Sequence, residues 1–215
     1  MALMDSLDMR PEEIEAESFR IIDTEAGDHG WPREEWQVVR RAIHTSADFE
    51  YARSLVLSDD VIERAVAAFR SGAGIVTDTN MALSGISKPR LTPLGCRVTC
   101  HVADTDVIEQ AKTGGITRSI AAMRKAAANP DNRIFVIGNA PTALFELLRL
   151  IETGSASPDL IIGLPVGFVG AEESKNALAC DTHGIPFITN IGRKGGSNVA
   201  AAVVNALAIL ATTPR

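Results

Sequence analysis

The feature that most constrains the fold is an alternation of short apolar runs with helical stretches over the second half of the chain. Strands are predicted over residues 133–137, 160–163 and 186–189, each followed by a helical pattern, over 141–153, 171–181 and 197–211. The first of these strands is almost entirely apolar, as expected where helices cover both faces of a parallel sheet. Strand–helix repeats of this kind predict an open α/β sheet with right-handed crossovers.

The first half of the chain begins with helical patterns and then joins the same alternation. Trp36, Val39, Ile43 and Ala47 recur at three- and four-residue steps, which marks the buried face of a helix over 32–47. Further helices are predicted over 11–25, from Ser58 as N-cap to near Gly72, over 105–112 and over 117–128, with strands over 74–77 and 97–102. The sequence therefore predicts one domain, residues 1–215: a three-layer, open, mainly parallel sheet flanked by helices, with an N-terminal helical segment.

Composition excludes several classes of protein. Hydrophobic residues make up 46% of the chain and charged residues 22%, which is typical of a globular protein. The formal net charge of -6 argues against non-specific nucleic-acid binding. Three cysteines are too few for a disulfide framework, the acidic start does not resemble a signal peptide, and no apolar run approaches the roughly 20 residues of a membrane span. We therefore expect a cytoplasmic protein that does not contact a membrane.

Glycines and polar residues gather directly after three predicted strands, over residues 138–142, 163–170 and 192–197. Ligands of open α/β sheets bind beyond the carboxyl ends of the strands, and helix N-termini there attract anions. Gly195, Gly196 and Ser197 beside Arg193 and Lys194 favour a carboxylate or a phosphate. Tight turns alone would also explain each loop taken singly. The common nucleotide fingerprints are absent from the sequence, which disfavours NAD and ATP.

Two polar side chains near predicted apolar faces are candidates for chemistry. His44 lies beside Arg41 on neighbouring rows of one helix, and a half-buried histidine there could act as an acid or a base, since its unperturbed pKa is about 6.5. A purely structural or exposed histidine has the same spacing, and spacing alone favours that interpretation. Ser18 is predicted to point toward the buried face of the first helix. It could contact a ligand or bond back to the carbonyl of the preceding turn.

Two other kinds of site find little support. A serine hydrolase is disfavoured because the sequence has no G-x-S-x-G turn. Cys96, Cys100 and His101 lie close together as potential zinc ligands, but successive residues of a strand, such as Cys100 and His101, point to opposite faces. Cys180 stands alone and is interpreted as a packing residue. We predict no metal site.

Five segments, in order along the chain, resemble the motifs of a known family. They cover residues 43–49 (IHTSADF), 77–82 (TDTNMA), 138–144 (GNAPTAL), 165–175 (PVGFVGAEESK) and 192–198 (GRKGGSN). They are similar to the motifs of the precorrin-8X methylmutases, and the resemblance runs from about Ser18 to Leu207. The segments around His44 and Gly195 resemble the cobalt-dependent branch more than the oxygen-dependent one.

The resemblance implies an isomerase of cobalamin biosynthesis. Such an enzyme moves a methyl group from C-11 to C-12 of precorrin-8X, or of cobalt-precorrin-8, and gives hydrogenobyrinic or cobyrinic acid. The family requires no cofactor and forms homodimers with sites near the subunit interface. It acts on a tetrapyrrole that carries many carboxylates. The alternatives are a non-catalytic corrinoid-binding or carrier protein of the same fold, and an unrelated α/β enzyme acting on a nucleotide or sugar phosphate.

The resemblance also assigns roles to individual residues. His44 resembles the catalytic histidine that lends a proton to the macrocycle, a kind of help typically worth 10²–10⁴-fold in rate. Ser18, Arg41 and Arg118 match positions that contact substrate. We expect loop residues to complete the binding site: Asn139, Thr142, Arg193, Lys194, Gly195, Gly196 and Ser197. The cations Arg193 and Lys194 would pair with substrate carboxylates.

Overall fold

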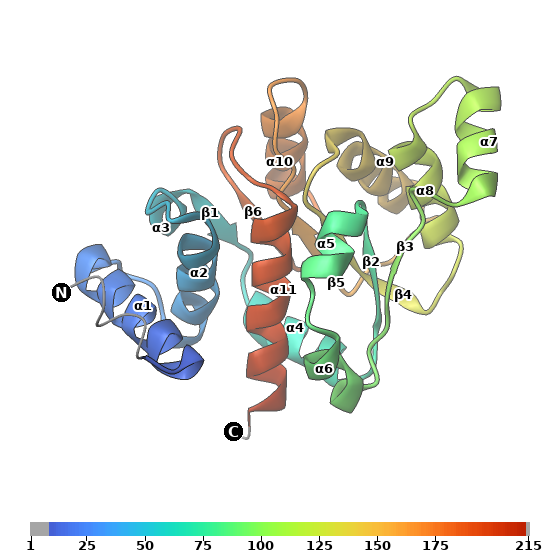
Figure 1. Ribbon diagram of the computed structural model, residues 1–215. Helices are drawn as coiled ribbons and strands as arrows, with labels where there is room; N and C mark the ends of the chain where they lie inside the picture. Colours follow the sequence, from blue (N-terminus) through green and yellow to red (C-terminus); the bar gives the residue numbers. More distant parts are fainter. Residues whose placement is uncertain (1–8, 214–215) are drawn as a thin grey trace.

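A single open sheet organises the chain in the computed structural model, which describes residues 9–213 (Figure 1). The sheet has six strands in the order β1-β6-β5-β4-β2-β3. Strand β1 runs antiparallel to β6, and the other pairs are parallel. The strands are β1 (Leu55–Leu57), β2 (Gly74–Thr77), β3 (Val98–Cys100), β4 (Asn132–Ile137), β5 (Leu160–Gly163) and β6 (Phe187–Asn190). The predicted α/β class, with a mainly parallel sheet, is confirmed.

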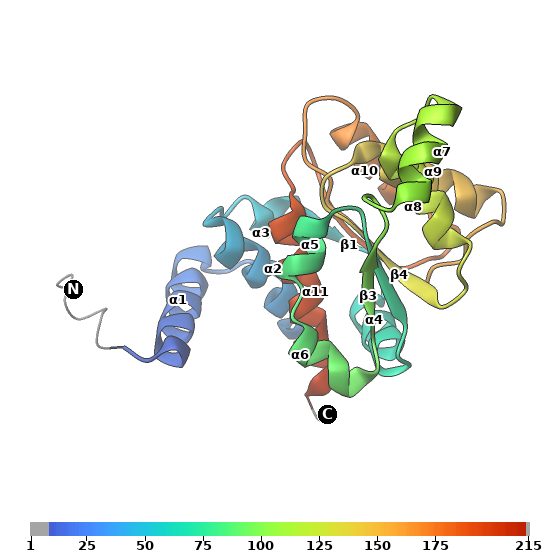
Figure 2. The same cartoon turned by 45° about the vertical axis from the view of Figure 1, so that its right-hand side comes forward.

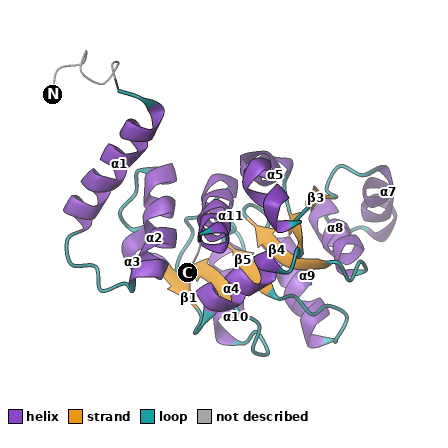
Figure 3. Ribbon diagram, turned by 90° about the horizontal axis from the view of Figure 1, so that it is seen from below, coloured by secondary structure: helices purple, strands orange, loops and turns teal. Residues whose placement is uncertain are grey.

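Helices cover both faces of the sheet, as the apolar strands predicted. Side chains of β4 alternate: Ile134 and Val136 pack with one cluster, while Phe135 and Ile137 pack with the other. The first cluster is supplied by α2 (Arg33–Ser46), α4 (Val61–Arg70) and α11 (Ser197–Thr212), and the second by α8 (Arg118–Ala127), α9 (Pro141–Glu152) and α10 (Ala171–Cys180). Seen from below, α11 and α9 lie on opposite sides of the strands (Figure 3). Helix α7 (Thr105–Gly114) packs on α8.

The N-terminal helix α1 (Pro11–Ala26) lies at one end of the molecule, beside α2 (Figure 2). Ile22 is the buried residue of this helix. Ile14 and Ile21, whose spacing suggested a buried face around Ser18, are 47% and 42% exposed. That expectation was wrong because α1 packs on a single neighbouring helix, and one contact covers only a narrow stripe.

The region around Ser58 also differs from its prediction. Ser58 is not the N-cap of α4, because its backbone N–H donates to the Phe187 carbonyl at 3.1 Å and its hydroxyl accepts from the Phe187 N–H at 2.9 Å. These bonds continue the pairing of β1 with β6. The N-cap is Asp60, in a left-handed conformation with φ of 56°. Gly72, with φ of 74°, follows the helix as expected.

Several short elements carry no clear pattern in the sequence. They are β1 and the helices α3 (Tyr51–Ser54), α5 (Asn80–Gly85), α6 (Lys88–Leu91) and η1 (Thr92–Leu94). Each spans six residues or fewer, which is too short for a helical or strand period to repeat. Within the described part of the chain, no helix is both long and apolar enough to cross a membrane.

Candidate functional site

Loops that follow the parallel strands gather at one edge of the sheet, the upper edge in Figure 1. Residues 78–79 follow β2, residues 138–140 follow β4, and residues 191–196 follow β6. Between them, residues 164–170 lead from β5 into α10. This is where ligands of open α/β sheets bind, because each loop also leads toward the N-terminus of a helix.

A buried carboxylate, Asp78, holds the loop after β4. Its oxygens accept hydrogen bonds from the backbone N–H groups of Gly138 (2.9 Å), Asn139 (2.9 Å) and Ala140 (2.7 Å). Burial raises the pKa of Asp78, and the three N–H donors oppose that rise. No role for Asp78 was predicted from the sequence, although it lies in the 77–82 motif directly after a predicted strand. Asp78 fixes the backbone that presents Asn139 to solvent.

Ser197, at the start of α11, lies against the same loop. Its hydroxyl is 2.8 Å from the hydroxyl of Thr79, and its side chain is buried. A Cβ atom on Gly138 would come within 2.7 Å of the Ser197 Cα, so only glycine fits there. The Ser197 hydroxyl therefore joins the β2 loop to α11, and the close approach of Gly138 brings the β4 loop against the same helix N-terminus.

The two glycines before α11 allow the last loop to lie against the one after β5. Gly195 has φ of 158°, and a Cβ atom there would lie 2.3 Å from the Leu164 carbonyl oxygen. The Gly196 N–H donates to that same oxygen at 2.9 Å. The Gly167 N–H donates to the Arg193 carbonyl at 3.2 Å. The two loops thus form one connected surface at the edge of the sheet.

The predicted cations Arg193 and Lys194 differ in their surroundings. Lys194 donates to Asp48 and, at 2.8 Å, to Glu50, both just after α2. These carboxylates raise the pKa of Lys194, and the ammonium lowers the pKa of Asp48. Arg193 is more exposed: its Nε is 3.9 Å from Glu172, and its guanidinium carbon is 5.9 Å from the Phe168 ring centroid. Lys194 therefore joins the glycine loop to α2, while Arg193 faces solvent.

His44 lies near the C-terminal end of α2, four residues before Asp48. Its ring centroid is 5.1 Å from that of Phe19 on α1. The side chain is exposed, which is one of the alternatives that the spacing left open, because Phe19 covers it from one side only. An exposed imidazole is accessible to a ligand. The Lys194–Asp48 contact brings its helix end to the edge where the strands end.

Arg41 and Ser18 lie with Phe19 at the contact between α1 and α2. The Arg41 guanidinium carbon is 4.6 Å from the Phe19 ring centroid, and its Nη1 is 2.6 Å from the Glu15 carboxylate. The Ser18 hydroxyl donates to the Ile14 carbonyl at 2.8 Å, one of the two alternatives that the sequence allowed. Arg41 and His44 are thus grouped around the ring of Phe19, and Ser18 directly precedes that residue on α1.

Arg118 and Thr142 begin two helices that approach each other at the same edge. The Thr142 hydroxyl is 3.2 Å from that of Thr117, which caps α8 directly before Arg118. Arg118 is exposed, as is Asn139 before α9. The structure therefore forms two groups of predicted residues: Arg118, Asn139 and Thr142 at the helices α8 and α9, and residues 193–197 tied to the end of α2.

The candidate zinc ligands are not arranged as a metal site. Cys96 is buried and donates to the Phe69 carbonyl at 3.2 Å, while His101 Nδ1 lies 2.9 Å from Asp104. In the described range, 9–213, no group of three or more His, Cys, Asp or Glu side chains could hold a metal ion.

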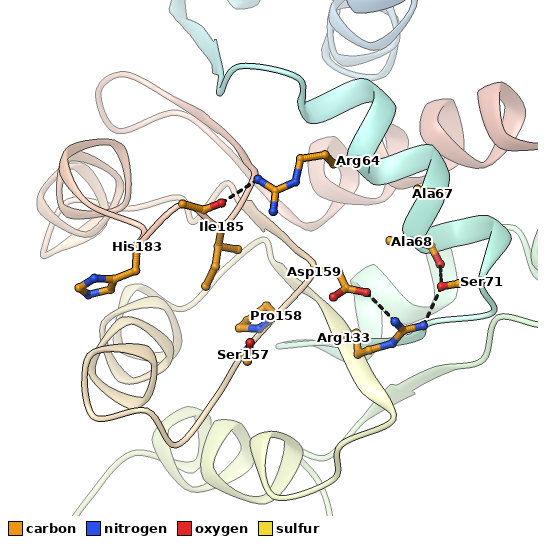
Figure 4. A pocket seen from close by; sticks show the side chains of 11 residues that line it. Arg64, Ala67, Ala68, Ser71, Arg133, Ser157, Pro158, Asp159, His183 and Ile185 are labelled. Carbon is orange, nitrogen blue, oxygen red and sulfur yellow. Dashed lines mark hydrogen bonds and ion pairs between the residues drawn. The ribbon is translucent and has the colours of Figure 1, made fainter.

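Cavities of about 570 and 690 Å³ lie at the opposite edge, where the parallel strands begin. Figure 4 shows the first of them. Its arginines already have partners: Arg133 contacts Asp159 at 2.8 Å and Ser71 at 2.7 Å, and Arg64 donates to the Gly184 carbonyl at 2.7 Å. None of the predicted site residues lines either cavity. We therefore assign the candidate site to the glycine loops.

The fold and this edge define a class: an open-sheet α/β protein whose glycine loops and helix N-termini meet at one edge of the sheet, the usual place for a ligand in such folds. A sequence profile of the precorrin-8X methylmutases matches residues 13–210. The chain belongs to the precorrin-8X methylmutase family.

Individual relatives agree with this assignment. The chain is 49% identical to the cobalt-precorrin-8 methylmutase of Priestia megaterium, over 95% of this chain and 90% of the relative. It is 47% identical to the cobalt-precorrin-8 methylmutase of Salmonella typhimurium, over 92% and 94%. Its structure is similar to that of the precorrin-8X methylmutase from Thermus thermophilus, with a TM-score of 0.86, 41% identity and coverage of 93% and 96%.

Proposed function

We propose that the chain is an isomerase that moves a methyl group from C-11 to C-12 of precorrin-8X or its cobalt form. The observation that carries the proposal is the ion pair between Lys194 and Asp48, which joins the glycine loop to the helix of His44. This contact supports a site in which the exposed imidazole and the glycine backbone act on the same ligand. Family membership supplies the reaction, and this geometry supplies the groups that it needs.

The methyl migration requires the protein only to bind the substrate and to supply one proton. The methyl group leaves one ring carbon and joins its neighbour, so no nucleophile or hydride carrier takes part. Arg193, Arg118 and Arg41 pair with substrate carboxylates at the rim of the macrocycle. His44 gives a proton to the conjugated ring, which makes the ring more electron-poor and eases migration, and takes the proton back afterwards.

A matched pair of histidine substitutions tests this role. His44→Asn removes the proton donor, and we expect kcat to fall by about 10²–10⁴ with product affinity little changed. His183→Asn makes the same chemical change at an exposed histidine beside the opposite cavity, where φ of 51° is tolerated by asparagine. Optical spectra during turnover are the measurement. Equal turnover by the two variants would refute the role of His44.

The same spectra separate the isomerase from a non-catalytic corrinoid carrier. A carrier would bind the product tightly and leave the spectrum of added precorrin-8X unchanged. An isomerase converts that spectrum to the spectrum of hydrogenobyrinic acid. Binding alone does not discriminate between the two, because both proteins hold the product.

We further propose that the cobalt form is the natural substrate. Two of the relatives named for cobalt-precorrin-8 share 49% and 47% identity with the chain, against 41% for the Thermus precorrin-8X enzyme. Single-turnover rates with both forms test this. A rate constant for precorrin-8X at or above that of its cobalt form would contradict the proposal.

We also propose that the chain, one domain over residues 1–215, works as a cytoplasmic homodimer whose second copy covers the open edge. Phe168 and Val169 are 85% and 89% exposed there, and Met81 and Ile191 are 71% and 59% exposed. Large apolar side chains grouped at an edge are typical of an interface. The free thiols of the three cysteines fit a reducing compartment. Sedimentation equilibrium tests the dimer, and a monomer at micromolar concentration would contradict it.

A further inference from the structure

Lys175 is a buried lysine behind the glycine loop, and no role described above uses it. It lies in α10, and only 1% of its surface is exposed. A buried ammonium group is costly unless hydrogen bonds compensate for the lost water. Its contacts therefore show what the position stabilises.

Two residues converge on one backbone carbonyl of the β6–α11 loop, residues 191–196. The Lys175 Nζ donates to the Lys194 carbonyl at 2.5 Å and to the Asn190 Oδ1 at 3.3 Å. The Asn190 Nδ2 donates to the same carbonyl at 2.9 Å and to the Ile191 carbonyl at 3.1 Å. Asn190, the last residue of β6, is itself buried. The loop is thus anchored to the sheet and to α10 at the residue where it turns.

Fixing that carbonyl also fixes what Lys194 and its neighbours present to a ligand. The side chain of Lys194 leaves the same residue to reach Asp48, so the anchor determines how the loop meets the helix of His44. Gly195 follows directly, and its backbone lies against the Leu164 carbonyl with no room for a side chain. A shift of the Lys194 carbonyl would move the cation, the glycines and the α2 contact together.

We propose that Lys175 is a positioning residue which, with Asn190, holds the β6–α11 loop in the shape that receives the substrate's carboxylates. This inference rests on the proposed function. Lys175 acts through the loop and does not itself touch the macrocycle. Its expected signature is weakened binding with the methyl shift itself little altered.

The charges around Lys175 are few. Burial lowers its pKa to about 8, and Glu172 on the same helix opposes that shift. Strand β6 carries no ionisable side chain, and in the β6–α11 loop Arg193 lies 3.9 Å from Glu172. On α9, which packs against α10, Glu146 is paired with two arginines. Near pH 8, a change in loop order is therefore expected to follow this ammonium group.

The test compares Lys175→Met with Lys125→Met. Lys125 lies in α8 and is paired with Asp104 and Asp106, so the control makes the same change and removes more ion pairs. We expect Lys175→Met to raise KM for the corrinoid by about tenfold, the scale of one charge-assisted hydrogen bond, with kcat within about threefold. Hydrogen exchange of residues 191–196 should speed up, while residues 138–140 exchange as in the wild type. Lys125→Met should change none of these.

Each outcome decides one question. Unchanged exchange of residues 191–196 in Lys175→Met refutes the positioning role, whatever the activity. Loss of kcat in proportion to unfolded protein refutes it too, because that would be a purely structural effect. Failure of the wild type to convert the substrate refutes the proposed function instead. If Lys175→Met does not fold, Asn190→Ala removes the other donor to the Lys194 carbonyl, and residues 191–196 that exchange as in the wild type in that variant overturn the inference.

Discussion

The two regions that supply predicted substrate contacts are held in different ways. The glycine loops are fixed from within, by Asp78 beneath one loop and Lys175 beneath another, each about 1% exposed. Helix α1 is held from outside, by packing on α2 and by the exposed ion pair between Arg41 and Glu15. Buried hydrogen bonds to charged groups are strong, and exposed ion pairs contribute little.

This difference indicates that the glycine loops and helix α1 have different roles. The loops are preorganised before the substrate arrives, since their backbone hydrogen bonds are already made. We expect the α1 contact to be weak enough to adjust, so that Arg41 exchanges Glu15 for a substrate carboxylate at small cost. Substitutions should therefore have large effects on stability at the loops and small ones at α1.

The largest effect is expected for Asp78→Ala. Three backbone N–H groups would lose their acceptor inside the protein, and we expect the free energy of unfolding to fall by about 4 kcal/mol. Urea denaturation measures the change. Asp159→Ala, which removes a half-exposed ion pair with Arg133, should cost less than about 1 kcal/mol. Similar losses in the two variants would contradict the comparison.

The second largest effect is expected for Gly195→Ala. Its Cβ atom would collide with the Leu164 carbonyl, and we expect a loss of about 2 kcal/mol together with most of the corrinoid affinity. Gly154→Ala is the matched control, because Gly154 has φ of 69° and no atom within 4 Å of its added Cβ. The control should lose about 1 kcal/mol and keep its affinity. Denaturation and equilibrium binding of the product distinguish the two.

The next largest effect is expected in the pH dependence of stability that Lys175 causes. Its pKa is lowered from 10.5 to about 8 on folding, so between these values the unfolded chain retains a proton that the folded chain has released. Stability from this group therefore rises with pH over that window, by at most about 1.4 kcal/mol per pH unit. The measurement is the difference between wild type and Lys175→Met in urea from pH 7 to 10. A constant difference would show that the ammonium is not perturbed by folding.

The smallest effect is expected at α1. Glu15→Gln removes the exposed partner of Arg41, and the free energy of unfolding should change by less than about 0.5 kcal/mol. Because Arg41 loses a competing carboxylate, KM for the polyanionic substrate should fall by up to about threefold. Steady-state kinetics test this, with Glu17→Gln as the control for another surface ion pair of the same helix. A marked rise in KM would mean that Glu15 orients Arg41 for binding.

Local patterns predicted much of the site along with the fold. The apolar run over 133–137 and the glycines around Gly195 predicted a strand and a glycine loop that the structure contains, because both depend on short-range sequence; anion binding by that loop stays a prediction. Asp78 and Lys175 were missed because their importance depends on burial, which a polar residue's own neighbours do not reveal. The spacing left open whether His44 is half-buried or exposed. Its exposure depends on how helix α1 covers α2, which the sequence around His44 does not reveal.

By itself, the sequence determined the alternation of strands and helices, the glycine loops at their ends and, through its motifs, the family. Each of these features depends on residues that are close together in the sequence, because periodicity and turn preferences are local properties. Only the tertiary structure decided that β1 pairs antiparallel with β6, and that Lys194 meets Asp48, 146 residues away. Such contacts follow from the packing of the whole core, since the geometry that joins distant segments is fixed only when helices and sheet close together.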